Sequence, residues 1–161
     1  MSRQLNMPHE QQEQGNWCWA AIAVATDRCY SAATIWTQCQ VATDEFGHPC
    51  CSQPSSSACN RVHQLEKALH RVKHYRTWTS AALTELEVRE EIDHNRPVAA
   101  RILWQGGGSH FVTICGYDDS DVELLLTVED PLYGQGPVAY NSLLVAYRNG
   151  QGRWTHSYYT Q

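Results

Sequence analysis

The sequence predicts a single domain of the α+β class, in which a helical N-terminal half packs on an antiparallel β-sheet formed by the C-terminal half. Its 161 residues suit one domain with a sizeable core. Helix-forming segments occupy the chain to about residue 95, and strand-like segments joined by short turns follow Pro97. No repeat or long linker divides the chain, so residues 1–161 are expected to form one unit.

Two helices are expected before the loop of residues 47–58. The first follows Asn16, a common N-cap residue type, and contains CWAAIAVATDRCY, which has good helix formers and neither Gly nor Pro. The second is expected from Ser31 to about Ala42. The segment GHPCCSQPSSSA that follows is rich in Ser and Pro, which is typical of a loop.

Two more helices are expected between this loop and the sheet. Asn60 precedes RVHQLEKALHRV, in which apolar residues recur at helical spacing. Thr84 and Glu87 form a capping-box pattern before a helix that ends near Asn95. Five strands are then expected, at VAARILW, HFVTICGY, VELLLTVED, GPVAY and RWTHSYYT.

Charge and hydropathy exclude several kinds of partner. The net charge of -5 argues against nucleic acid or an anionic membrane surface. No apolar run approaches the roughly 20 residues that span a bilayer. The N-terminal MSRQLNMPHE has no apolar core of a Sec-type signal peptide. The chain is therefore expected to stay in the cytoplasm, to leave the cell by a non-Sec route, or to be cut from a larger polypeptide.

The cysteines point instead to an oxidising compartment. Four of the seven fall within one stretch of 21 residues that includes the expected loop: Cys39, Cys50, Cys51 and Cys59. Their spacing does not match the knuckles of structural zinc sites, although His48 could be a further ligand, so two disulfides are favoured over a metal or free thiols. A bond between the adjacent cysteines is strained, which leaves two connectivities open. Cys29 and Cys115 are expected to be packed, unreactive thiols.

Cys18 lies in the stretch QEQGNWCWAA, where a helix is expected to begin. A nucleophilic cysteine must be a thiolate, and the unpaired N–H groups of a first helical turn favour negative charge. Lowering a thiol pKa by about 4 units requires roughly 5–6 kcal/mol, more than a helix end supplies. A nucleophilic Cys18 therefore needs a histidine cation nearby in space.

His110 is the best of the eight histidines for this role. It follows Gly-Gly-Gly-Ser and opens an expected strand, where small residues leave room for a substrate. Three others are expected on a solvated helix face or just after it (His63, His70 and His74). The remaining four have no convergent partner in the sequence pattern (His9, His48, His94 and His156).

Asp130 is the expected partner of His110. If the apolar faces of HFVTICGY and VELLLTVED pair, Tyr117 lies opposite Glu123 and His110 lies opposite Asp130. Glu129 then points to the other face. The alternative is that Asp130 and the Pro131 after it only form a turn.

These residues together resemble the papain clan of cysteine peptidases. Gln12 stands six residues before Cys18, Trp19 follows it directly, and His110 and Asp130 come later in the same order. The sequence is most similar to compact bacterial double-glycine peptidases, which trim bacteriocin leaders, and to secreted effector proteases with a QxxxxxCWAA core. The similarity is stronger around Cys18 than around His110.

The resemblance implies a papain-like fold and a role for each residue. Cys18 attacks, His110 is the base, Asp130 orients His110, and Gln12 with the backbone N–H of Cys18 binds the oxyanion, Gln14 being the weaker candidate. Trp19 is expected to pack under the histidine–aspartate pair. Trp17 could line the cleft or cover the helix end. No metal or organic cofactor is implied.

The expected function is that of a thiol endopeptidase acting on a protein or peptide, with small residues or glycine at the cleaved bond. A papain-fold glutamine deamidase or transglutaminase would use the same triad. A disulfide-stapled binding module with a buried Cys18 is the non-enzymatic alternative. With only 17 residues before Cys18, no pro-segment is expected to cover the cleft. A separate immunity protein would then restrain a bacterial effector or toxin that acts in a target-cell cytoplasm, unless narrow specificity makes restraint unnecessary.

Overall fold

A seven-stranded antiparallel sheet separates two groups of helices in the computed structural model, which describes residues 1–161. The strands run in the order β2-β7-β3-β4-β5-β6, and β1 also pairs with β4. Their bounds are β1 Ser2–Gln4, β2 Tyr75–Thr79, β3 Val98–Trp104, β4 Ser109–Asp118, β5 Leu125–Asp130, β6 Gly134–Ala139 and β7 Gly152–Thr160.

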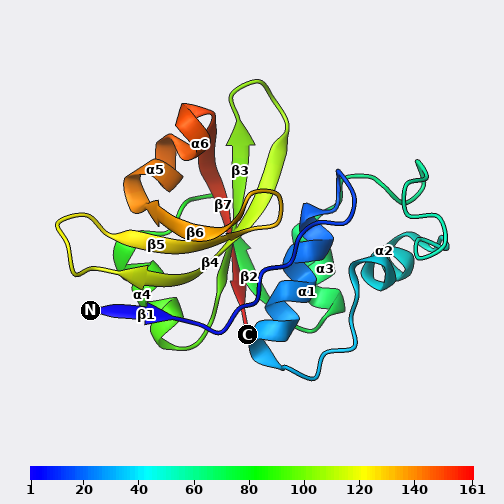
Figure 1. Ribbon diagram of the computed structural model, residues 1–161, viewed down its shortest axis with the longest axis horizontal. Helices are drawn as coiled ribbons and strands as arrows, with labels where there is room; N and C mark the ends of the chain where they lie inside the picture. The colour runs from blue at the N-terminus through cyan, green and yellow to red at the C-terminus, as the bar shows by residue number, and fades with distance from the viewer.

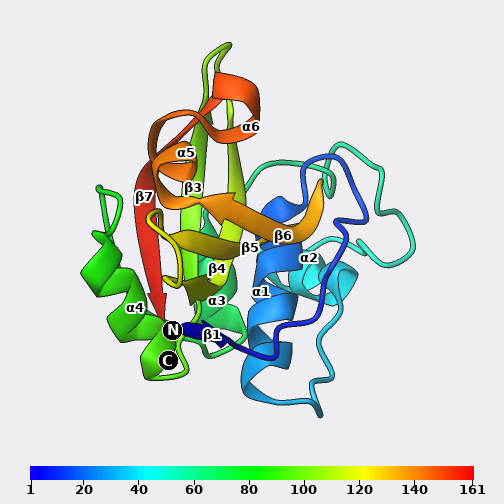
Figure 2. The ribbon, with the colours of Figure 1, turned by 60° about the vertical axis from the view of Figure 1, so that its left-hand side comes forward.

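Three helices lie together on one side of the sheet, as both ribbon views show (Figure 1, Figure 2). They are α1 Cys18–Tyr30, α2 Gln38–Phe46 and α3 Leu65–Arg71. The other three are α4 Glu85–Asp93, α5 Tyr140–Val145 and α6 Tyr147–Gly150. Helix α4 packs on β1, β3 and β4, and α5 packs on β6 and β7. None of the six helices is long and apolar enough to cross a membrane.

The interior consists of two hydrophobic cores. The helical core contains buried residues of α1, α2 and α3 together with Ala99, Phe111 and Tyr158 of the sheet. The sheet core contains apolar residues from the other face of β3 and β4 and from β5, packed with those of α4 and α5. Successive residues of β3 alternate between the two cores because side chains of a strand point to opposite faces. The α+β class and the helical-half-on-sheet arrangement are confirmed.

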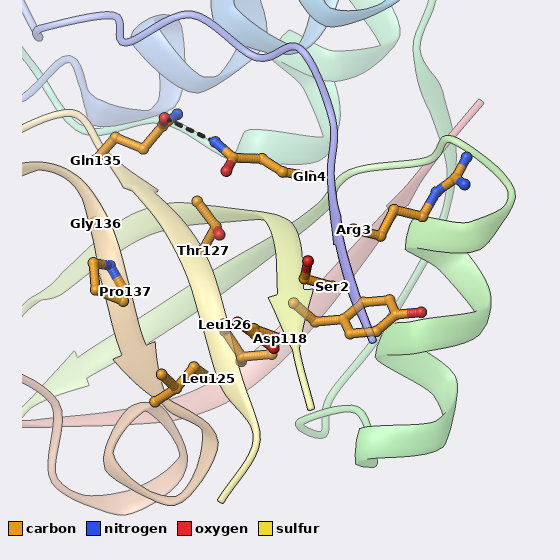
Figure 3. A pocket seen from close by; sticks show the side chains of 11 residues that line it. Ser2, Arg3, Gln4, Asp118, Leu125, Leu126, Thr127, Gln135, Gly136 and Pro137 are labelled. Carbon is orange, nitrogen blue, oxygen red and sulfur yellow. Dashed lines mark hydrogen bonds between the residues drawn. The ribbon is translucent and has the colours of Figure 1, made fainter. Parts of the chain in front are cut away.

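The N-terminal strand β1 pairs with β4 at Gly116–Asp118, beyond the first residue of β3, which pairs at Ile114. A Cβ atom at Gly116 would lie 2.8 Å from the carbonyl oxygen of Arg3, so this close pairing requires glycine. A hollow of about 450 Å³ lies beside β1, and across it Nε2 of Gln4 donates to Oε1 of Gln135 at 3.4 Å. Figure 3 shows the side chains that line this hollow. This hollow contains no cysteine or histidine.

Most predicted elements form, with different bounds in the first half. The capping box of Thr84 and Glu87 is present at the start of α4. The second helix was predicted from Ser31 to Ala42 but begins at Gln38, where Thr37 caps it by accepting from the backbone N–H of Gln40. The third was predicted to follow Asn60 but begins only at Leu65, which leaves Val62 exposed.

Two strands and two helices were not predicted. β1 and β2 are short, and β2 has mostly exposed residues without an apolar face. The helices α5 and α6 have six and four residues, too few for a helical period to be read from the sequence.

The predicted register of the β4–β5 hairpin is wrong. Tyr117 lies opposite Leu126 rather than Glu123, and Thr113 lies opposite Glu129. A bulge between Ile114 and Gly116 shifts the pairing by one residue, and the connection before Leu125 is longer than expected. The shift near the site is even, so the apolar faces still meet in the sheet core.

Candidate active site

Cys18 is the first residue of α1, as the sequence predicts, and its side chain is largely buried. The N-cap position belongs to Trp17, which makes no side-chain capping bond, and not to Asn16. The first N–H groups of a helix have no intrahelical acceptor, so the backbone N–H of Cys18 is available to a developing oxyanion.

The segment before Cys18 is held by the end of the cysteine-rich loop. The backbone N–H of Asn16 donates to Oδ1 of Asn60 at 3.0 Å, and the side-chain amide of Asn16 donates to the carbonyl of Asn60 at 3.1 Å. The indole N–H of Trp17 donates to the carbonyl of Cys59 at 2.8 Å. Trp17 is fully buried, so it anchors the helix end to this loop and does not line the cleft.

The four loop cysteines form two disulfides, Cys39–Cys51 and Cys50–Cys59. This is one of the two connectivities that the sequence leaves open. Cys18, Cys29 and Cys115 are free. Burial raises the pKa of Cys29 to about 11 and that of Cys115 to about 12, so neither is a thiolate near neutral pH.

His110 lies at the start of β4 and is 5% exposed. Its Nε2 lies 2.8 Å from Oδ1 of Asp130, at the end of β5. The structure therefore brings together the two residues that strand parity pairs, even though their register differs from the predicted one. The turn before the strand contains Gly107 and Gly108 at φ of 93° and 81°, a region that L residues with side chains rarely adopt.

Asp130 is fixed from several directions. Its Oδ1 also accepts the backbone N–H groups of Leu132 and Tyr133 at 2.8 and 3.1 Å. Its Oδ2 accepts the hydroxyl of Tyr147 at 2.6 Å in a buried setting. Tyr147 has no signal in the sequence, because it belongs to the short unpredicted helix α6 and lies 17 residues from Asp130.

Burial and hydrogen bonding oppose each other in the pKa values of this pair. Burial lowers the pKa of His110, whereas the hydrogen bond to Asp130 and the neighbouring Cys18 thiol raise it, and the result is about 9. Burial raises the pKa of Asp130, but the hydrogen bonds from His110, Tyr147 and Leu132 outweigh it and lower that pKa. An imidazolium–carboxylate pair beside Cys18 is therefore the stable form at neutral pH.

Trp104 stacks on His110 and Tyr133 meets its ring edge-on at 6.5 Å, whereas Trp19 does neither. The Trp104 and His110 rings stack with centroids 5.9 Å apart and planes 20° apart. Trp19 is fully buried in the helical core, where its ring contacts His63 at 4.9 Å and its indole N–H donates to the carbonyl of Arg61. The expected packing of Trp19 under the histidine–aspartate pair is therefore wrong.

Gln12 lines the same cleft as Cys18 and His110, which Gln14 does not. Its Nε2 donates to the carbonyls of Gln14 and Gly15 at 3.0 and 2.9 Å, and its Oε1 is buried without a partner. Both amide protons are thus engaged by backbone. An oxyanion in the cleft would have to share or replace one of these bonds.

The cleft lies between the helical half and the sheet, with a volume of about 690 Å³. Cys18 lies on its helical wall, His110 and Trp104 lie on its sheet wall, and Gln12 reaches it from the segment before α1. No group of three or more His, Cys, Asp or Glu side chains converges as a metal site. The arrangement can attack a carbonyl with a thiolate and move a proton through an imidazole.

Three other histidines have carboxylate partners that the sequence does not reveal. His63 bonds to Glu45 at 2.8 Å and His74 bonds to Asp27 at 2.9 Å, so the expectation of a solvated face is wrong for both. His9, for which no partner was expected, bonds to the buried Glu129 at 2.6 Å. None of these three pairs includes a cysteine.

A family model described as the Peptidase_C39 like family matches residues 4–160. Several solved structures share the fold, two of them along almost the whole chain. One, described as a C39-like peptidase from Bacillus anthracis, is 13% identical with a TM-score of 0.60, covering 98% of this chain and 97% of that chain. The other, a double glycine motif protease from an AMS/PCAT transporter in complex with the leader peptide, is 16% identical with a TM-score of 0.55, covering 98% and 94%. No curated protein matches the sequence significantly.

Proposed function

The chain belongs to the Peptidase_C39 like family, and from that premise we propose that it is a cysteine endopeptidase acting through Cys18, His110, Asp130 and Gln12. The observation that carries this proposal is the shared cleft. Cys18 begins a helix there beside His110, whose other neighbour is the buried carboxylate of Asp130.

The reaction begins with attack of the Cys18 thiolate on the carbonyl carbon of the scissile peptide bond. The developing oxyanion accepts the backbone N–H of Cys18 and an amide N–H of Gln12. His110 then gives its proton to the leaving amine, and the C–N bond breaks to leave a thioester. Because Nε2 of His110 is hydrogen-bonded to Asp130, Nδ1 of His110 is the nitrogen that exchanges protons with the thiol and the leaving amine.

Hydrolysis of the thioester reuses the same groups. Neutral His110 takes a proton from water, the hydroxide attacks the acyl carbon, and the C–S bond breaks to release the acid and the Cys18 thiolate. Asp130 keeps the imidazole oriented and stabilises its cation, as the raised pKa of His110 requires. The Trp104 ring covers one face of the imidazole and excludes water from it.

We propose a peptide with glycine or another small residue at the cleaved bond as the substrate. The structural likeness to a double glycine motif protease in complex with a leader peptide supports this choice. Glutamine deamidation would proceed through the same thioester, with ammonia as the leaving group.

The decisive experiment has two parts. Iodoacetamide at about pH 6 should label Cys18 rapidly and stoichiometrically, because an unactivated thiol hardly reacts there. A proteome-derived peptide library, treated with the wild type or with Cys18→Ala, should then yield new peptide termini with the wild type alone. Cys18-dependent deamidation without cleavage would show that the protein is a glutamine deamidase and not a peptidase. An unreactive Cys18 together with no product would favour the non-enzymatic binding module.

We propose further that the protein is an effector or toxin that leaves the producing cell and is held by an immunity protein in that cell. The two disulfides support passage through an oxidising compartment. Expression of the wild type in a bacterial cytoplasm should be toxic relative to Cys18→Ala. Equal tolerance of both forms, with the wild type shown to be active in the lysate, would contradict the toxin role in that host.

A further inference from the structure

The cleft has a charge opposite to that of the molecule as a whole. The chain has 17 acidic and 12 basic residues and a net charge of -5. Nevertheless, no Asp or Glu lines the cleft. A second hollow of about 650 Å³ continues from it past Trp104, which lines both, and no Asp or Glu lines this hollow either.

Three cations occupy these two hollows. Arg61 and Lys67 line the helical wall of the cleft, and Arg148 lines the second hollow. All three side chains are exposed, and none lies within ion-pair distance of a carboxylate. Elsewhere, six arginines are each paired with an acidic residue: Arg3, Arg28, Arg71, Arg76, Arg89 and Arg96. Arg101, Arg153 and Lys73 are also unpaired but line neither hollow. Half of the unneutralised cations therefore lie where a substrate would bind, at Arg61, Lys67 and Arg148.

Two of these guanidinium groups are also held in position. Arg61 lies over the ring of Phe46 at 4.1 Å, and Arg148 lies over the ring of Tyr133 at 3.8 Å. Stacking on a ring restricts the side chain but leaves the N–H donors at the guanidinium edge free for a carboxylate. Arg148 and its neighbour Asn149 have φ of 53° and 60°, an uncommon backbone for residues other than glycine.

We propose that the substrate is an acidic peptide segment, with Asp or Glu side chains on residues close to the scissile bond. This proposal rests on the proposed peptidase function. Arg61 and Lys67 receive carboxylates from the helical wall, and Arg148 receives one beyond Trp104. No acidic residue lines either hollow, so an acidic peptide meets no repulsion there, whereas a basic peptide meets three cations.

The test begins with the cleavage sites in a proteome-derived peptide library, in which Asp and Glu should be enriched near the cleaved bond. A matched peptide pair then isolates the charge, with Glu residues replaced by Gln around one cleavage site. The wild type should show a kcat/KM about tenfold higher for the Glu peptide in dilute buffer, and the ratio should fall as salt rises.

Variants assign the preference to the named cations. Arg148→Gln, Arg61→Gln and Lys67→Gln should each reduce the Glu-to-Gln ratio about twofold, which is typical of one partly exposed charge pair. Lys73→Gln is the matched control, because Lys73 is unpaired but lines neither hollow, and it should leave the ratio unchanged. Arg148→Glu should shift the preference toward a peptide with Lys at the position that Arg148 serves.

Two failures are distinguishable. Equal cleavage of the Glu and Gln peptides by the wild type, with Cys18→Ala inactive, would overturn the acidic preference and leave the peptidase intact. No cleavage of any peptide, together with an unreactive Cys18 thiol, would overturn both.

Discussion

The helical wall of the cleft is held by a cross-linked loop, whereas its sheet wall is held by strand pairing. Cys18 is positioned through Asn16 and Trp17, which bond to the loop next to the Cys50–Cys59 disulfide. His110 and Asp130 belong to β4 and β5, which are paired along most of their length. The helices beside α1 have nine and seven residues and cannot fix a long loop by themselves, so the covalent bonds supply the missing restraint.

The N-terminal strap, residues 9–13, joins the two walls. The buried side chain of Gln38 on α2 bonds to three positions of the strap, between 2.7 and 3.0 Å. From the sheet, Glu129 accepts the backbone N–H of Glu10, and the carbonyl of Pro131 accepts that of Gln12 at 2.9 Å. The residue after Asp130 is therefore tied directly to the candidate oxyanion residue.

Removal of the reacting group from either wall should have the largest effect. Cys18→Ala and His110→Ala should each lower kcat by about 10⁴-fold or more, since attack and proton transfer act as one unit. The double variant should be no worse than either single one. Turnover numbers on a cleaved peptide measure this, and an active His110→Ala would show that the sheet wall supplies no base.

The strap should contribute less than the two reacting groups. Gln12→Ala should lower kcat by about 10²-fold, the usual cost of losing one oxyanion donor, while Gln14→Ala should change it little. KM should stay nearly constant in both. A fully active Gln12→Ala with an impaired Gln14→Ala would move the oxyanion role to Gln14.

Loss of a disulfide should lower both stability and activity, because the cross-linked loop holds the helical wall. The double variant Cys50→Ser with Cys59→Ser should lower the free energy of unfolding by about 2–4 kcal/mol and should also reduce kcat/KM, because the loop holds Asn16 and Trp17. Cys29→Ser, which alters a free thiol, is the control and should retain activity. Full activity of the double variant below its unfolding midpoint would show that the loop does not position Cys18.

The pH dependence of stability and of kcat/KM should reflect the protonation of His110 on the sheet wall. The pKa of His110 is raised from 6.5 to about 9, so its contribution to stability is complete below about pH 6.5 and is lost as the pH rises through about 9. Activity needs the imidazolium to protonate the leaving amine, so kcat/KM should fall about tenfold per unit above pH 9. A decline centred near pH 7, without unfolding by circular dichroism, would contradict the imidazolium pair.

Tyr147→Phe should have the smallest effect. It removes one donor to Asp130 and should lower kcat about threefold to tenfold without changing KM, since the other donors remain. The Asp130 carboxylate would then be less neutralised and would raise the pKa of His110 further. The alkaline limb of the kcat/KM profile should therefore move to higher pH. Tyr140→Phe, whose hydroxyl bonds to the carbonyl of Leu83, is the matched control. An unshifted limb would make the role of Tyr147 purely structural.

The comparison also explains which parts of the fold could be predicted. Helix α1 and strands β3 and β4 have long apolar patterns, and they form close to the predicted bounds. Strand parity placed His110 and Asp130 on one face although the register was wrong, because an even shift preserves the face. Ser31 failed as a helix start because the competing cap at Thr37 lies six residues later in a weakly patterned segment.

The sequence by itself determined the α+β class, the start of α1 at Cys18 and the pairing of His110 with Asp130, because each depends on local helix propensity or on a period of two or 3.6 residues. Tertiary structure alone decided that Trp104 and not Trp19 covers His110, that Tyr147 holds Asp130, and that Cys50 pairs with Cys59. These contacts join residues whose separation follows no period, and only the packing of the two cores brings them together.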